Sequence, residues 1–148
     1  MDYFEIAKRS YDMLERNLAT CEDFEWYNTF AADCQQGIEK FMKAGIETFS
    51  GEGIDEHIFK SHKLGRMAEI INSHFEDLID VRTAAWIEDF YFDARYPGDD
   101  FVVVSKDTAL ELFEATKNIS EKLIEVYNNQ KSSEKTSFFG EDSSDKED

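Results

Sequence analysis

Apolar residues recur at intervals of three and four along most of the chain, a period typical of helices that pack through one face. The first run covers residues 3–18 and breaks around Thr20 and Asp23. The second covers residues 26–49 and has a wide apolar stripe. Two glycines within residues 50–53 then end the period. These patterns predict two helices that can turn back on each other.

Two further apolar runs predict a third and a fourth helix. Ser61 precedes the run over residues 64–71, and its hydroxyl is a good N-cap for an amide of the first turn. The period continues over residues 75–90, with a break near residues 72–73 because Asn and Ser compete for backbone hydrogen bonds. The fourth helix must end before the residue that precedes Pro97, since that residue avoids helical angles.

The last third of the chain begins with a short apolar segment over residues 101–104, which has strand propensity but no candidate partner strand. We therefore expect an extended loop pressed on the helices. Ser105 is placed to cap a final helix, Asp107 lies in its first turn, and residues 109–127 carry its apolar face. From Lys131 the composition becomes too polar to pack, which predicts disorder.

The predicted fold is therefore all-α: an up-and-down bundle of about five helices over residues 1–130, followed by a disordered acidic tail over residues 131–148. A chain of 148 residues with 41% apolar content can form one domain with a proper core. Phe138 and Phe139 interrupt the tail and are a candidate docking motif, although an aromatic pair can also have no role.

The net charge of −17 bears most directly on function. The tail carries six acids and three bases, which leaves about −14 on the predicted domain. Such a surface repels phosphate backbones and argues against broad nucleic-acid binding. A basic partner, or a nucleotide held in one locally positive pocket, remains compatible with it. The charge can also serve solubility alone.

Several common site classes are not indicated by the sequence. Cys21 and Cys34 lack the spacing of a zinc or redox site, so we expect two buried thiols in a reducing compartment and no metal. No phosphate-binding glycine loop or hydrolase elbow occurs, and no cofactor is predicted. The acidic N-terminus is unlike a signal peptide, and no apolar run reaches membrane-spanning length. We therefore expect a cytoplasmic protein without membrane attachment.

Four elements, in order, resemble the HEPN (higher-eukaryote and prokaryote nucleotide-binding) domain family. The elements are the second-helix segment Cys34–Ala44 with its Glu-Lys pair and following Lys-Ala, the His-x-Leu at His62–Leu64, the Arg-Tyr-Pro within Ala94–Pro97, and the closing helix with Ala109 and Ala115. The resemblance spans residues 3–127. It implies a helical domain and raises the nucleotide-binding hypothesis.

The same elements contain the candidate ligand-binding residues Lys43, His62, Arg95 and Tyr96. If Lys43, His62 and Arg95 converge, they form a positive pocket that can hold a phosphate. Simpler interpretations exist for each. Glu39 and Lys43, four apart on one helix, can be a surface ion pair worth about 0.3–0.5 kcal/mol. His62, at a helix start, can close a loop by hydrogen bonding. Arg95 can neutralise the carbonyls at a helix end, and Tyr96 can fill the edge of the core.

Many HEPN proteins are metal-independent ribonucleases that use an Arg, four to six further residues and a His, paired across a dimer. This chain departs from that pattern, because seven residues separate Arg66 from His74. Eight helical steps correspond to about 12 Å of rise. No catalytic residue is therefore assigned. Irregular pairs, either Arg66 with His74 or His62 with Arg95, remain the alternative.

The resemblance thus favours a non-catalytic HEPN module that forms a homodimer through an apolar helix face and binds a nucleotide or regulates a partner. In such families the partner is often a separately encoded nucleotidyltransferase of a toxin-antitoxin or defence system. The rival hypothesis is a ribonuclease toxin with an irregular Arg/His pair.

Overall fold

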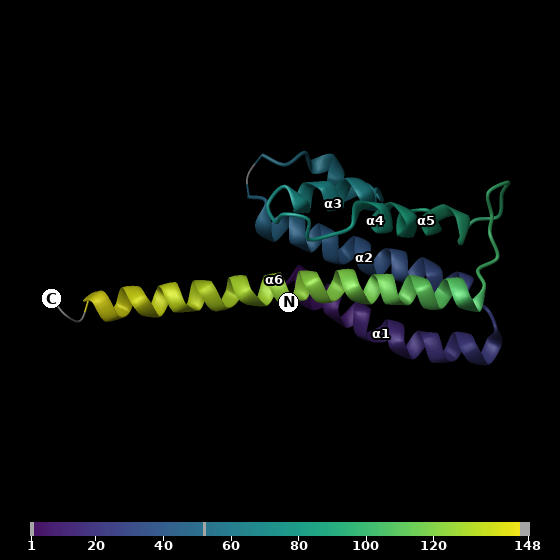
Figure 1. Ribbon diagram of the computed structural model, residues 1–148, viewed down its shortest axis with the longest axis horizontal. Coiled ribbons are helices and arrows are strands. Elements are labelled where there is room, and N and C mark those ends of the chain that lie inside the picture. Colours follow the sequence, from purple (N-terminus) through teal and green to yellow (C-terminus); the bar gives the residue numbers. More distant parts are fainter. Residues whose placement is uncertain (1, 52, 146–148) are drawn as a thin grey trace.

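The computed structural model describes residues 2–51 and 53–145, with side chains described up to Ser133. Every regular element in those residues is a helix, as the sequence predicts. The α-helices are α1 (Tyr3–Phe24), α2 (Asn28–Phe49), α3 (Leu64–Asn72), α4 (Val81–Glu88), the single turn α5 (Phe90–Asp93) and α6 (Lys106–Asp145), and a 3-10 helix, η1, covers Glu56–Lys60. Figure 1 shows α1, α2, α4–α5 and α6 running in alternating directions, and α2 contacts every other α-helix.

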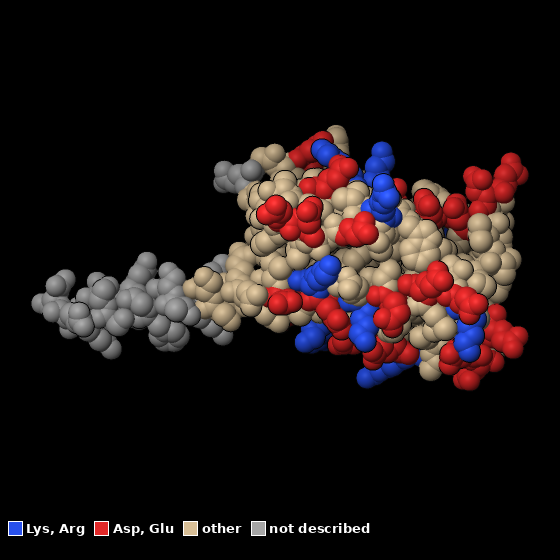
Figure 2. All heavy atoms as spheres, viewed as in Figure 1, with Lys and Arg blue, Asp and Glu red and all other residues tan. Residues whose placement is uncertain are grey.

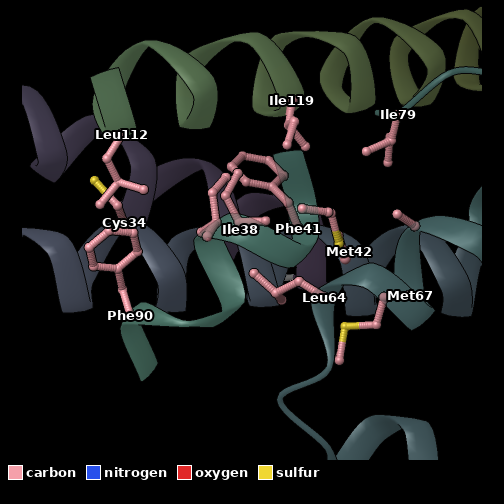
Figure 3. Packing of buried hydrophobic residues seen from close by; sticks show 14 of the residues in the cluster. Cys34, Ile38, Phe41, Met42, Leu64, Met67, Ile79, Phe90, Leu112 and Ile119 are labelled. Carbon is pink, nitrogen blue, oxygen red and sulfur yellow. The ribbon is translucent and has the colours of Figure 1, made fainter. Parts of the chain in front are cut away.

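The core is built around α2. Its side chains Ile38, Phe41 and Met42 are fully buried, and Figure 3 shows them facing Leu64 of α3 and Ile119 of α6. Burying a side chain of this size stabilises the fold by about 1.5–3 kcal/mol. Helix α2 is therefore the central element on which the other α-helices pack. In the part of the chain that is described, no helix has the length and apolar character to cross a membrane.

Helix α1 is longer than its pattern predicts. Asp2 caps it, and Glu5 completes a capping box in which each side chain accepts the other's backbone N–H at 2.8 Å. The break expected at residues 20–23 is wrong. The Thr20 hydroxyl donates to the carbonyl one turn earlier, so it is satisfied within the helix. The helix ends at Phe24, and Glu25 follows as its C-cap in the left-handed conformation (φ 52°).

The start of α3 also differs from the prediction that Ser61 caps it. The Ser61 hydroxyl instead donates to the Ile58 carbonyl at 3.0 Å and closes η1. An acceptor from α4 serves the first turn of α3, because the Gly65 N–H donates to the Glu88 carboxylate at 3.2 Å. A tertiary contact therefore replaces the local cap.

The fourth helix is shorter than predicted. The break near Asn72 is confirmed, but residues 73–80 form a connector, and α4 begins only at Val81. The Asn72 side chain holds the connector by bonding both the carbonyl and the N–H of Ile79, at 2.7 and 2.9 Å. Asp80 then caps α4. The helical segment ends at Asp93, ahead of Pro97 as predicted.

The loop over residues 94–105 also differs from its prediction. Phe101, Val102 and Val103 are 36%, 49% and 69% exposed, and of residues 101–104 only Val104 is buried. Polar contacts rather than apolar packing fix the loop. The buried Asn28 side chain donates to the carbonyls of Ala94 (3.1 Å) and Val102 (2.7 Å) and accepts from the N–H of Val104 (2.9 Å).

The last helix starts as predicted, since the Thr108 N–H donates to the Ser105 hydroxyl at 3.1 Å. Its inner face packs on α2 and ends with Tyr127, which stacks on Phe4. The backbone continues as a helix to Asp145, projecting beyond the bundle in Figure 1, although the composition from Lys131 predicts disorder. The side chains of residues 134–145, Phe138 and Phe139 among them, lie outside the described residues, as do residues 146–148. The domain boundary at residue 130 stays a prediction.

Candidate functional site

A polar row on α2 forms the centre of the candidate site. Gln35, Glu39 and Lys43 follow one another at four-residue intervals, so they share one face of the helix. Glu39 accepts hydrogen bonds from Gln35 Nε2 at 3.1 Å and from Lys43 Nζ at 3.0 Å. His62 Nδ1, from the segment before α3, lies 2.7 Å from the same carboxylate. A single carboxylate thus connects two of the predicted ligand-binding residues.

The burial of this network changes the meaning of the Glu39–Lys43 pair. The two side chains are only 13% and 16% exposed, so the pair is not the surface ion pair of the simplest interpretation. A largely buried charge is stable only when it is paired and hydrogen-bonded. The row therefore depends on Glu39 to hold the Lys43 ammonium and to orient the His62 ring.

Tyr91 connects His62 to Arg95. The His62 and Tyr91 rings are stacked, with centroids 3.8 Å apart and planes inclined by 17°. The Arg95 guanidinium carbon lies 5.1 Å from the centroid of the Tyr91 ring, within the range of a cation–π contact. The structure thus places His62, Lys43 and Arg95 in one continuous set of contacts. We call Gln35, Glu39, Lys43, His62, Tyr91 and Arg95 the Glu39 cluster.

Tyr96, the fourth predicted residue, lies outside the Glu39 cluster. Its ring is 52% exposed and contacts Phe92 at a centroid distance of 6.1 Å. Sequence reasoning missed Tyr91. The signal was present, because Tyr91 precedes Arg95 by four residues and an aromatic at that spacing can lie under a guanidinium.

An open groove of about 350 Å³ adjoins the Glu39 cluster and is lined in part by His62, Tyr91 and Phe92. Carboxylates of α4, α5 and the residue between them also line it: Glu88, Asp89 and Asp93. Partial burial raises the pKa of Asp89, and the nearby Asp93 charge raises it further. Lys63 also lines the groove, so its three carboxylates outnumber one ammonium group. This excess of negative charge favours a cationic or uncharged group over a phosphate, and the phosphate pocket stays a prediction.

The two irregular Arg/His pairs are placed very differently. Arg66 lies in the first turn of α3, is 63% exposed and pairs with Glu69 at 3.0 Å, whereas His74 follows the other end of that helix. Within one chain these two residues do not meet. His62 and Arg95, in contrast, both lie against Tyr91.

The thiols and possible metal ligands add no second centre to the described residues. Cys34 is buried as predicted, and this burial raises the pKa of its thiol to about 12. Cys21 is only partly buried, so the prediction of two buried thiols is wrong for this residue. In the residues with described positions, no group of three or more His, Cys, Asp or Glu side chains is arranged to hold a metal ion.

Comparison with known proteins agrees with the fold. The HEPN domain family matches residues 1–127. This range includes α1 to α5 and the part of α6 up to Tyr127, which packs on the bundle. No curated protein and no solved structure gives a significant match. Because the family match covers most of the 148 residues, the chain belongs to the HEPN domain family.

Proposed function

We propose that this protein is a non-catalytic HEPN module that acts by binding a protein partner. The observation that carries the proposal is the state of the Glu39 cluster. Lys43 and His62, which a phosphate pocket would need, both contact the Glu39 carboxylate. A nucleotide phosphate would have to compete with that buried carboxylate for both groups.

The charges around the groove support a partner that is not a nucleic acid. Glu88, Asp89 and Asp93 border the groove beside His62, and the domain as a whole is strongly acidic. These charges attract Lys and Arg side chains and repel phosphate backbones. A basic protein surface is therefore the ligand class that the charges favour.

Thermal-shift and capture experiments test the proposal together. We expect ATP, GTP and other nucleotides at millimolar concentration to leave the unfolding midpoint within about 1 °C of its value without ligand. Tagged full-length protein, cross-linked in its own host, should capture a basic protein. A nucleotide that raises the midpoint of the wild type but not of Lys43→Ala or His62→Ala would overturn the proposal in favour of a nucleotide-binding domain.

Two finer proposals come from the family resemblance. We propose that the chain forms a homodimer and that its partner is a separately encoded nucleotidyltransferase of a toxin-antitoxin or defence system. Light scattering should give twice the mass of one chain, and a monomer at micromolar concentration would contradict the dimer. Co-expression with an adjacent nucleotidyltransferase gene should give a complex that co-purifies.

A second candidate function is a ribonuclease that uses His62 and Arg95. One observation favours it, namely that Glu39 contacts Nδ1 of His62, an arrangement that in general acid–base sites leaves Nε2 for proton transfer. Arg95 lies against the same Tyr91 ring as His62. RNA cleavage by the wild type that disappears in both His62→Gln and Arg95→Gln would establish this function instead.

A further inference from the structure

Large apolar side chains are exposed at the end of the bundle where α1 turns into α2. Phe24 and Trp26 of this turn are 77% and 48% exposed, and Val102 and Val103 of the loop before α6 are 49% and 69% exposed. We call these four residues the end platform. Exposed apolar residues are common singly, but a contiguous group is typical of an interaction site.

Hydrogen bonds and an ion pair fix the two halves of the end platform side by side. Asn28, two residues after Trp26, binds the Val102 carbonyl at 2.7 Å and the Val104 N–H at 2.9 Å. Lys106, at the start of α6, pairs with Glu22 of α1 at 3.4 Å. Figure 1 shows the α1–α2 turn and the loop before α6 at the same end of the bundle. The end platform therefore needs little reorganisation before it binds.

A groove of about 390 Å³ opens beneath Phe24 and Trp26. Its walls include Cys21, Phe30 and Asp33, so an apolar side chain can enter it beside one carboxylate. Asp33 is half-buried, and this burial raises its pKa, while the charges of Arg95 and Lys40 and a hydrogen bond from Asn17 act in the opposite direction. Its carboxylate therefore places one acidic group in the wall of the groove. A large apolar anchor next to a basic residue fits both features.

Acidic residues surround the end platform. Glu22, Asp23 and Glu25 flank it on the α1 side, and Asp99 and Asp100 precede its loop segment. Figure 2 shows uncharged surface at the right-hand end of the molecule, with acidic groups above it and, below it, acidic groups together with basic side chains. Two copies that met through this end would bring their acidic rims together, which opposes self-association here.

We propose that the end platform docks a short segment of a protein partner in which one or two large apolar side chains are flanked by Lys or Arg. The apolar side chains would cover the end platform and enter the groove beneath Trp26, and the basic residues would meet the acidic rim. The inference rests on the proposed partner-binding function and deepens it by naming the surface and the chemistry of the partner.

Synthetic peptides test this docking directly. A set of fluorescein-labelled twelve-residue peptides would share Leu and Phe anchors and range in net charge from strongly negative to strongly positive. We expect fluorescence anisotropy to detect binding that strengthens with positive charge and weakens as salt rises. Phe24→Ser and Val103→Ser should each weaken the best peptide at least about tenfold, the scale of a hot-spot residue.

Matched controls separate this surface from general stickiness. Met13→Ser removes an exposed apolar side chain elsewhere on α1, and Asp12→Lys reverses an exposed charge there, so both should leave affinity unchanged. Asp23→Lys should weaken binding of the basic peptides. No binding by any basic peptide, equal binding by acidic peptides, or equal loss in Met13→Ser would each overturn the inference.

The capture experiment distinguishes failure of the docking inference from failure of the proposed partner-binding function. If the Phe24→Ser/Val103→Ser double variant still captures the partner of the wild type, the end platform is not the docking surface but partner binding stands. If the wild type captures no protein and instead binds a nucleotide, the proposed function itself fails.

Discussion

Replacing Asn28 with alanine is the sharpest test of how the bundle holds the loop before α6. The side chain is 2% exposed and makes three hydrogen bonds, two as donor to Ala94 and Val102 and one as acceptor from Val104. At about 0.5–1.5 kcal/mol each, these bonds contribute about 3 kcal/mol together. The variant also leaves buried backbone groups without their partner, which adds to the loss.

We expect Asn28→Ala to lower the free energy of unfolding by about 3 kcal/mol and the unfolding midpoint by roughly 10 °C. Urea titration gives the free energy of unfolding, with helix content followed by far-ultraviolet circular dichroism and side-chain packing by tryptophan fluorescence. Thermal unfolding followed by circular dichroism gives the midpoint temperature. Asn17→Ala is the matched control, because its amide makes one long, half-buried bond of 3.5 Å to Asp33. A loss below about 0.5 kcal/mol for Asn28→Ala, or an equal loss in both variants, would refute the reasoning.

Three other changes probe the buried groups. Glu39→Ala leaves the Lys43 ammonium largely buried without its carboxylate, so it should lower the free energy of unfolding, measured by urea titration, by about 3 kcal/mol. The control Glu69→Ala breaks an exposed pair and should lower it by less than about 1 kcal/mol. Equal losses in the two variants would contradict a buried network. In the native protein a thiol reagent should label Cys21 and should reach Cys34 only after unfolding, because Cys34 is buried and the pKa of its thiol is raised to about 12. Labelling of both thiols in the native protein at similar rates would contradict this packing. The free energy of unfolding should fall as pH rises above about 9, because the unfolded Cys34 thiol ionises near its ordinary pKa of 9.0 while the folded thiol, with its pKa raised to about 12, keeps its proton. Cys34→Ala should make this decline shallower. An unchanged slope in that variant would contradict the burial of the thiol.

Much of the fold could be predicted from the spacing of apolar residues and from the residues that cap or break helices. The 3.6-residue repeat predicts α2 closely, and Ser105 begins α6 as a local cap should. Two of the errors occur where a residue distant in sequence decides the outcome. Glu88 supplies the acceptor that Ser61 is expected to supply, and Asn28 fixes a loop whose own apolar residues predict burial. Such contacts join residues far apart in sequence, so no local pattern reveals them.

The candidate site shows the same division. Spacing along α2 predicts the Glu39–Lys43 pair, but not its burial or its contact with His62. The contact between His62 and Tyr91 depends on how the segment before α3 packs on α4 and α5, which the sequence pattern leaves open. Charge could be predicted for the domain as a whole, whereas the carboxylates that line the groove emerge only from the fold.

The central claim is that this HEPN module binds a partner and does not cut RNA. The most direct measurement incubates purified full-length protein with labelled single-stranded RNA in buffer without metal ions, beside His62→Gln and Arg95→Gln. We predict intact RNA in all three reactions over several hours, with the variants indistinguishable from the wild type. Cleavage by the wild type that is lost in both variants would contradict the account and make the Glu39 cluster a catalytic site.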